Sequence, residues 1–388
     1  MAHDFFLTRR SWWTRAGRIV VAAVAAASVS SAPRVRAADA LPDRLTDAAF
    51  WTLIESLSEP GGAFQSENLL SNETGFQAVI PRLTQLTKPG GVYMGVGPEQ
   101  NFTYIAAIRP KIAFIIDIRH QNMLEQMIYK ALFEMSADRA EFVSRLFSLK
   151  RPAGLNGQST VDELFRAYLA APMDNDAFTT NLRDIRDLLL KKHHFALTKD
   201  DEIDIEHVYT VFHDFGPDIN YNSGAGGGRR GGGMPNYVDL MTAMDRQGEH
   251  RSYLASEENY RVVRDLELHN LIVPLTGDFG GPMAIRAVGQ YVRDHNATVS
   301  AFYLSNVERY LFQSTGPNQN GGWTSFYDNV ATLPLDASST FIRSVSGGIA
   351  RGAPGMRMPN VLASMQDTLA AVKDGRIRTY DDVFSISR

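Results

Sequence analysis

Two glycines and one aspartate in this 388-residue chain have the spacing of a nucleoside-binding site. Gly95 and Gly97 end a short apolar segment, and Asp117 directly follows a second one, Ile112 to Ile116. Such segments are typical of buried parallel strands joined by a short helix. Glycines in the turn let the backbone approach a ligand, and an aspartate at the second strand end can accept hydrogen bonds from two ribose hydroxyls.

The amino-acid sequence of the turn indicates which nucleoside-containing ligand it would suit. Dinucleotide-binding turns have a third glycine, which lets the helix pack closely on the strand beneath a pyrophosphate. This chain has Gln100 at that position, directly after Glu99, itself a candidate for the crevice. S-adenosylmethionine has no pyrophosphate, so the pattern favours this cofactor over NAD. A turn that only joins strand to helix, and an Asp117 that only caps the next turn, remain alternatives.

Two later strand ends carry polar side chains at the same predicted edge of the sheet. Asp278 follows residues 271–275, at a position where a polar side chain commonly recognises adenine. Asn306 and Glu308 follow residues 298–304, where acceptor substrates are usually held. An amide and a carboxylate there could orient a nucleophile and remove its proton. All three side chains could instead cap the helices that follow them.

A polar segment before the first strand could reach the same edge. Asn72 and Glu73 end residues 64–73, which have no helix or strand pattern, and residues 256–259 form a second such segment. If these segments converge on the sheet, Glu73 lies in the crevice. The alternative is that they form hydrogen bonds between loops that pin the outer helices.

Alternating strands and helices predict a doubly wound, mostly parallel α/β sheet with extra N-terminal helices. Strands are expected at 92–96, 112–116, 271–275, 298–304 and 341–345, and helices at 41–60, 76–86, 122–135, 283–295 and 360–373. The predicted domain covers residues 41–345. It contains a helical insertion at about 138–215 and a glycine-rich loop at 220–236, and residues 346–388 are a C-terminal extension.

Residues 1–40 are typical of an export signal. Arg9 and Arg10 precede an apolar segment of 14 residues, Ile19 to Ala32, and small-residue cleavage sites end near Ala37 and Ala40. The paired arginines favour the twin-arginine route, so we expect a periplasmic protein. A membrane span needs about 20 apolar residues, so we expect no stable span after cleavage. An uncleaved anchor and a misplaced start codon are the alternatives.

Composition weighs against several functions. The net charge of -4 becomes -9 without residues 1–37, which hold six arginines and one aspartate, so we expect no nucleic-acid partner. The chain has no cysteine and therefore no disulfide or thiolate chemistry. It also lacks the Gly-x-Ser-x-Gly turn of hydrolases and the Gly-x-x-x-x-Gly-Lys-Ser/Thr phosphate loop. Adjacent His193 and His194 cannot easily face one ion, and we expect no metal site.

Five segments of the chain resemble a family of uncharacterised bacterial proteins: residues 61–64, 68–73, 95–104, 253–259 and 305–308. That family has a fold similar to S-adenosylmethionine-dependent methyltransferases, and the resemblance covers roughly residues 45–345. It implies that Gly95 and Gly97 form the cofactor turn, that Asp117 lies at the ribose and that Asp278 lies near the adenine. The chain has no Asn-Pro-Pro-Tyr or Asp-Pro-Pro-Tyr segment, which weighs against methylation of DNA or glutamine amides.

Two functions are compatible with these observations. The first is an S-adenosylmethionine-dependent methyltransferase of unknown acceptor, in which Asn306 and Glu308 orient and deprotonate the nucleophile. The second is an exported, non-catalytic protein that binds a nucleoside-like ligand or a protein partner. It follows from the predicted export, because no supply of the cofactor is evident outside the cytoplasm. The oligomeric state is not indicated by the sequence.

Overall fold

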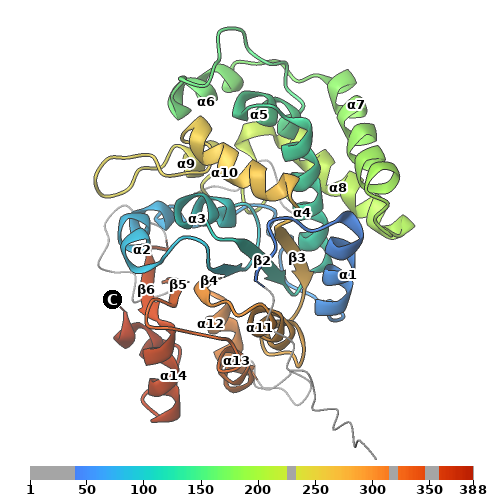
Figure 1. Cartoon of the computed structure of the whole chain (residues 1–388). Helices are drawn as coiled ribbons and strands as arrows, with labels where there is room; N and C mark the ends of the chain where they lie inside the picture. The colour runs from blue at the N-terminus through green and yellow to red at the C-terminus, as the bar shows by residue number, and fades with distance from the viewer. Residues whose placement is uncertain (1–39, 225–232, 314–321, 346–357, 388) are drawn as a thin grey trace, which may run out of the picture. The chain divides into compact units, whose positions relative to one another are not determined.

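The structure, a computed structural model, describes residues 40–224, 233–313, 322–345 and 358–387. The predicted export signal therefore lies outside the described residues, as do positions 225–232 of the predicted glycine-rich loop. The described residues form an α/β structure in which helices flank one mostly parallel sheet of six strands (Figure 1). This architecture agrees with the predicted α/β class and mostly parallel sheet.

The sheet has the strand order β3-β2-β1-β4-β5-β6. Its strands are β1 (Val92–Gly95), β2 (Ile112–Asp117), β3 (Ile272–Thr276), β4 (Val299–Ser305), β5 (Thr340–Ser344) and β6 (Asn360–Ser364). The first five pair in parallel, and their predicted positions are confirmed to within one or two residues. The chain turns in opposite directions after β1 and β4, so the carboxyl ends of these neighbouring strands leave a crevice between the connections.

Helices cover both faces of the sheet (Figure 1). One face carries α3 (Gln100–Ile108), α4 (His120–Met135) and α10 (Glu257–Leu268). The other carries α11 (Ala284–Asp294), α12 (Val307–Gln313), α13 (Gly322–Val330) and α14 (Met365–Lys373). At the N-terminal end, α1 (Asp47–Leu57) packs beside the edge strand β3, and the 3₁₀ helix η1 (Phe76–Val79) leads into α2 (Ile80–Leu86) next to α3.

A group of further helices follows α4 and precedes α10 in the sequence. It packs on the outer side of α4 (Figure 1). It comprises α5 (Arg139–Phe147), α6 (Val161–Leu169), α7 (Asn175–Arg186), the π-helix η2 (Asp187–Lys192), α8 (Lys199–Phe215), η3 (Gly216–Asp218) and α9 (Tyr237–Met241). Sequence signals start two of them. Thr160 with Glu163, and Thr198 with Asp201, form capping boxes that satisfy the first free N–H groups of α6 and α8.

The prediction of a helix at 360–373 is wrong for residues 360–364. Residues 360–364 form β6, which pairs antiparallel with β5 from Asn360 opposite Ser344 to Ser364 opposite Thr340. The Ser364 side chain then caps α14 by accepting from the backbone N–H of Asp367. Pairing with β5, which is distant in the sequence, selects the strand here, and a local periodicity contains no such information. Part of the expected C-terminal extension is therefore a strand of the sheet, and a final 3₁₀ helix, η5 (Asp381–Ile386), follows α14.

The hydrophobic core is continuous across both faces of the sheet. Tyr93, Phe114 and Phe302, on three neighbouring strands, are completely buried. Strands buried on both sides need near-continuous apolar segments, which is why the sequence indicated them so clearly. In the described ranges, no helix combines the length and the hydrophobicity that crossing a membrane requires.

Candidate functional site

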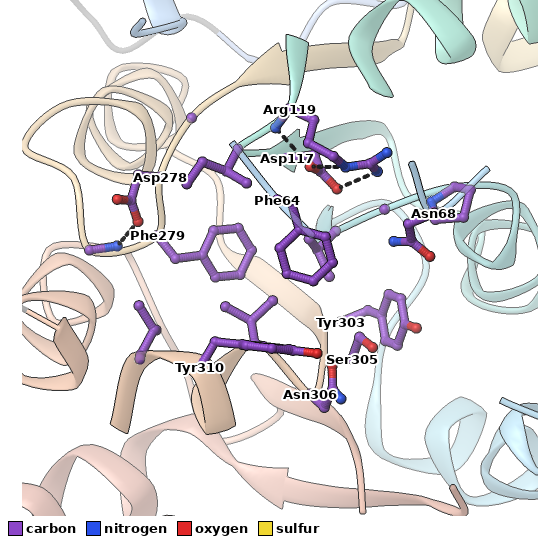
Figure 2. A pocket seen from close by; sticks show the side chains of 18 of the residues that line it. Phe64, Asn68, Asp117, Arg119, Asp278, Phe279, Tyr303, Ser305, Asn306 and Tyr310 are labelled. Atoms are coloured by element: carbon purple, nitrogen blue, oxygen red, sulfur yellow. Dashed lines mark hydrogen bonds and ion pairs between the residues drawn. The ribbon is translucent and has the colours of Figure 1, made fainter. Parts of the chain in front are cut away.

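A cavity of about 500 Å³ opens at the carboxyl ends of β1 to β4 (Figure 2). Ligands of open α/β sheets bind at this position, outside the strand ends where the order reverses. Six predicted site residues line it: Asn72, Glu73, Gly97, Asp117, Asp278 and Asn306. Gly95, Glu99 and Glu308, and the segment 256–259, are not among the lining residues. The cavity is therefore the place where most of the sequence-predicted side chains converge.

The glycine turn after β1 is held by an asparagine that the sequence argument did not single out. Asn101 donates from Nδ2 to the carbonyl oxygens of residues 96, 97 and 98, at 3.0, 3.2 and 2.8 Å. Its Oδ1 accepts from the hydroxyl of Tyr93 at 2.8 Å. A Cβ atom at Gly95 would lie 1.9 Å from that Oδ1, so this glycine makes room for the amide that shapes the turn.

Gly97 has a different requirement. Its φ of 76° lies in the left-handed region, which favours glycine. A Cβ atom there would meet only Asn68 Nδ2, at 3.7 Å, and Asn68 also lines the cavity. The backbone at residue 97 is consequently bare on the cavity side, which is the close main-chain approach that the sequence predicted for a ligand.

Asp117 lines the cavity and is already paired with Arg119. The Nε and Nη2 atoms of Arg119 donate to Oδ1 and Oδ2 of Asp117 at 3.1 and 3.2 Å, and the backbone N–H of Arg119 donates to Oδ1 at 2.9 Å. Oδ2 accepts a single one of these bonds, so it keeps a lone pair for a ligand hydroxyl. In the described part of the chain, Nη1 of Arg119 is buried without a hydrogen-bond partner.

Asp278 follows β3 and lines the cavity to the left of Asp117 in Figure 2. Its Oδ1 accepts from the backbone N–H of Gly280 at 2.9 Å, which closes a local turn. The start of α11 is instead served by Glu59, whose carboxylate accepts from the backbone N–H of Ala284. The same carboxylate accepts from the backbone N–H of Asp278 at 3.1 Å. Burial raises the pKa of Glu59, although backbone hydrogen bonds from Ala284 and Asp278 oppose this shift.

The end of β4 is irregular where it borders the cavity. Its register with β5 shifts between Tyr303 and Ser305, and Ser305 has a φ of 49°. A left-handed conformation is uncommon for serine and is concentrated at functional sites. Asn306, a predicted site residue, comes next and lines the cavity together with Tyr310. This strand end therefore presents a hydroxyl, an amide and a phenol to any ligand.

Glu308 was expected to act as a base at this strand end, and its position argues against that role. Its carboxylate accepts from Arg343 on β5, from Nε at 2.7 Å and from Nη2 at 3.1 Å, and also from the hydroxyl of Tyr327. Both members of the ion pair are 2% exposed or less. The helix α12 turns Glu308 toward the sheet and away from the cavity, so the pair joins α12 to β5.

Glu73 does reach the cavity, whereas Glu99 lies beneath it. Glu73 Oε1 accepts from Ser305 Oγ at 2.5 Å, and Oε2 accepts from Gln100 Nε2 at 2.9 Å and from Asn360 Nδ2 at 2.8 Å. The prediction that Glu99 lies in the crevice is wrong because that side chain is completely buried and is not among the residues that line the cavity. Burial raises the pKa of Glu99 to about 8, so Glu99 is protonated at neutral pH.

Aromatic rings form the apolar part of the cavity. Figure 2 shows the rings of Phe64, Phe279 and Tyr310 around its middle, between the Asp117 pair and the end of β4. Phe64 and Tyr310 meet edge to face with centroids 5.2 Å apart. Flat faces next to a few convergent polar groups suit a ligand with a planar ring and a polar chain.

Several contributors to the site were missed by the sequence argument, among them Phe64, Asn101, Arg119 and Asn360. Arg119 had a usable signal, because it stands two residues after the strand-ending Asp117. Asn101 also lay within a segment already singled out. Asn360 had none, since it reaches Glu73 across 287 residues of chain. In the described ranges, no group of three or more metal-ligating side chains is arranged to hold an ion.

The mostly parallel six-stranded sheet, with a cavity at its reversal of strand order, is an α/β arrangement compatible with a Rossmann-like fold. The chain belongs to the family described as a domain of unknown function, DUF7790, whose model matches residues 69–385. No curated protein matches the chain.

Proposed function

We propose that the cavity binds S-adenosylmethionine and that the protein is a methyltransferase of the Rossmann-like class. The observation that carries this proposal is the joint exposure of the bare main chain at Gly97 and the carboxylate of Asp117 to one cavity. Under this proposal the amino-acid part of the cofactor lies along Gly97 and the ribose at Asp117. The adenine lies between Asp278 and the aromatic rings.

Charge supports this ligand over a dinucleotide. Among the described lining residues, Arg119 is the sole arginine or lysine, and Asp117 already occupies two of its nitrogens. A pyrophosphate would have to lie next to three carboxylates, those of Glu73, Asp117 and Asp278. The antiparallel β6 also departs from the parallel six-stranded dinucleotide arrangement. A sulfonium cofactor suits these surroundings better, because it has no phosphate.

Methyl transfer asks little of the protein beyond alignment, since the sulfonium makes the methyl group electrophilic. In this proposal Asn306, at the end of β4, orients the acceptor in line with the methyl group. Glu308 is excluded from the reaction by its ion pair with Arg343. This loss of the expected base favours a second candidate, a non-catalytic protein that binds the same adenosyl ligand.

Calorimetric titration of residues 40–388 with S-adenosylmethionine and S-adenosylhomocysteine tests the binding step. We expect saturable binding of both ligands and a higher Tm in their presence. Absence of both effects at millimolar ligand would rule the proposal out. Binding without transfer of a labelled methyl group to any fraction of extract from the source cells would leave the non-catalytic function.

Two matched glycine variants separate ligand contact from backbone strain. Gly97→Ala and Gly90→Ala both place alanine at a positive φ, 76° and 86°, with no atom closer than 3.7 Å to the new Cβ. Each should cost about 1–2 kcal/mol of stability. Only the Gly97→Ala variant puts the methyl group into the cavity, so only this variant should weaken S-adenosylhomocysteine binding, by tenfold or more. Equal affinities for the two variants would contradict a ligand at residue 97.

A further inference from the structure

Glu73 is a buried carboxylate with an unusual set of partners. It is 1% exposed and lines the cavity. Its oxygens accept from the hydroxyl of Ser305 and from the side-chain amides of Gln100 and Asn360, and the hydroxyl of Tyr303 is a further hydrogen-bonding neighbour. None of these donors carries a charge, and no ion pair forms between Glu73 and another described residue. Burying a carboxylate without a cation is costly, so a carboxylate that borders a cavity and has no cation among its described neighbours favours a cationic ligand.

The other two carboxylates that line the cavity already have hydrogen-bond partners close to them in the sequence. Asp117 is paired with Arg119, and Asp278 accepts from the backbone at Gly280. The described lining residues include three acids and one arginine, which gives the cavity a formal charge of -2. A cavity of this charge favours a cationic ligand and opposes phosphates.

The position of Glu73 indicates which part of a ligand it would meet. Its carboxylate touches Ser305 at the end of β4, and Gln100 at the start of α3, just after the glycine turn. Asp117 and Asp278 follow the neighbouring strands β2 and β3, where we place the ribose and adenine. Glu73 thus lies at the end of the cavity that is left for the aliphatic chain of an adenosyl ligand.

We propose that Glu73 binds an aliphatic ammonium group, so that the cavity selects aminoalkyl nucleosides over nucleotides. This inference rests on the proposed function, because it assumes that a nucleoside occupies the rest of the cavity. The ammonium replaces no existing cation. It adds one charge-assisted contact to a carboxylate that Ser305, Gln100 and Asn360 already hold in place.

The test compares three adenosine ligands that differ at the 5′ position. S-adenosylhomocysteine carries the ammonium, 5′-methylthioadenosine lacks the whole amino-acid part, and AMP carries a phosphate there. Each is titrated into residues 40–388 and into the Glu73→Gln and Asp278→Asn variants. Asp278→Asn is the matched control, since it removes one carboxylate from the same cavity at the nucleoside end.

We expect wild-type protein to prefer S-adenosylhomocysteine to AMP. The Glu73→Gln variant should bind S-adenosylhomocysteine at least tenfold more weakly while its affinity for 5′-methylthioadenosine changes less than twofold. The retained binding of 5′-methylthioadenosine, together with a cooperative melting curve, shows that the variant is folded. Asp278→Asn should alter both adenosyl affinities by the same factor, because it acts on the part that they share.

Three outcomes would overturn the assignment. Equal losses for both adenosyl ligands in Glu73→Gln would mean that Glu73 shapes the cavity and contacts no ammonium. An unchanged S-adenosylhomocysteine affinity would mean that Glu73 does not meet the ligand. If wild-type protein binds neither adenosyl ligand, the proposed function fails first, and the ammonium site fails with it.

Discussion

Acidic side chains near the cavity are stabilised in different ways, and these differences decide what each can do. Glu308 and Asp117 each have an arginine partner, but of the two only Asp117 borders the cavity. Glu99 holds a proton at neutral pH because burial raises its pKa to about 8. Glu73 is held by neutral donors. In the sequence all four are simply acids near strand ends or turns.

Substituting Glu308→Gln should destabilise the protein without affecting its ligand. The change leaves Arg343 buried without a counter-charge, and breaking such a pair costs about 3–5 kcal/mol. Urea unfolding should show this loss, while S-adenosylhomocysteine binding at low temperature stays unchanged. The double variant Glu308→Leu with Arg343→Met should recover part of the stability. If Glu308→Gln is as stable as wild type but no longer binds S-adenosylhomocysteine, Glu308 acts at the ligand site and this prediction is wrong.

Asn101, at the start of helix α3, fixes the ligand-facing turn. Asn101→Ala removes three hydrogen bonds to the turn and leaves the buried hydroxyl of Tyr93 without its acceptor, a loss of about 3 kcal/mol. We expect lower stability together with at least tenfold weaker S-adenosylhomocysteine binding. Thr103→Ala is the control, since this buried residue of the same helix bonds the backbone of Tyr253 and not the turn. A similar loss of binding in both variants would show that α3 as a whole, and not the turn, was damaged.

Five strands could be predicted from the sequence, and for β1 to β4 the reason is that burial on both faces requires a near-continuous apolar segment. The strand β6 could not, because the antiparallel pairing of Asn360–Ser364 with β5 is a tertiary property. The same limit applies to side-chain direction. Asp117 ends a strand whose carboxyl end must face the crevice, so its place was predictable. Glu308 lies in the first turn of a helix, and only the packing of α12 decides which way its side chain points.

The helices α1, α4 and η2 are joined by one imidazole. The Nε2 atom of His193 lies 2.9 Å from Glu134, and its Nδ1 atom lies 2.9 Å from Asp47. Burial alone would lower the pKa of His193, but its two carboxylate partners outweigh burial and raise it. For Glu134 burial acts in the other direction and raises the pKa. Its contacts with His193 and Lys130 outweigh burial and lower the pKa to about 2.

These shifts predict how the junction responds to pH. The stabilisation from His193 is complete below the unfolded pKa of about 6.5 and is lost as pH rises through the higher folded value. The stabilisation from Glu134 is present above a pH of about 4.5, its unfolded pKa, and is lost as the pH falls toward 2. The free energy of unfolding of wild-type protein, measured with urea, should therefore exceed that of His193→Gln near pH 5.5, and by a smaller margin near pH 8.5. His207→Gln, which removes a more exposed imidazole, is the control. A pH-independent difference would contradict the charged junction.

The C-terminal residues belong to the same structural unit as the cavity. The described residues all belong to one compact unit, and the family match continues to residue 385. Within this unit β6 covers the edge of β5, while Asn360 supplies one of the three donors to Glu73. The sequence suggested an extension after residue 345 because no motif of the site lies there. This segment contributes strand pairing, buried core side chains and long-range hydrogen bonds such as that from Asn360 to Glu73. The partners of these contacts cannot be read from a local sequence pattern.

A chain that ends at Val345 should therefore lose its fold as well as its ligand. Removing β6 leaves unpaired the N–H and C=O groups of β5 that face it, and it empties the core positions of Leu362, Ala363 and Met365. We expect residues 40–345 to aggregate or to melt without cooperativity, as followed by circular dichroism. A peptide of residues 358–388 added during refolding should restore cooperative melting and S-adenosylhomocysteine binding, because it can pair with β5 again. A truncated chain that melts cooperatively within a few degrees of the full one and still binds the ligand would show that β6 is dispensable to the sheet and that Glu73 needs no donor from it.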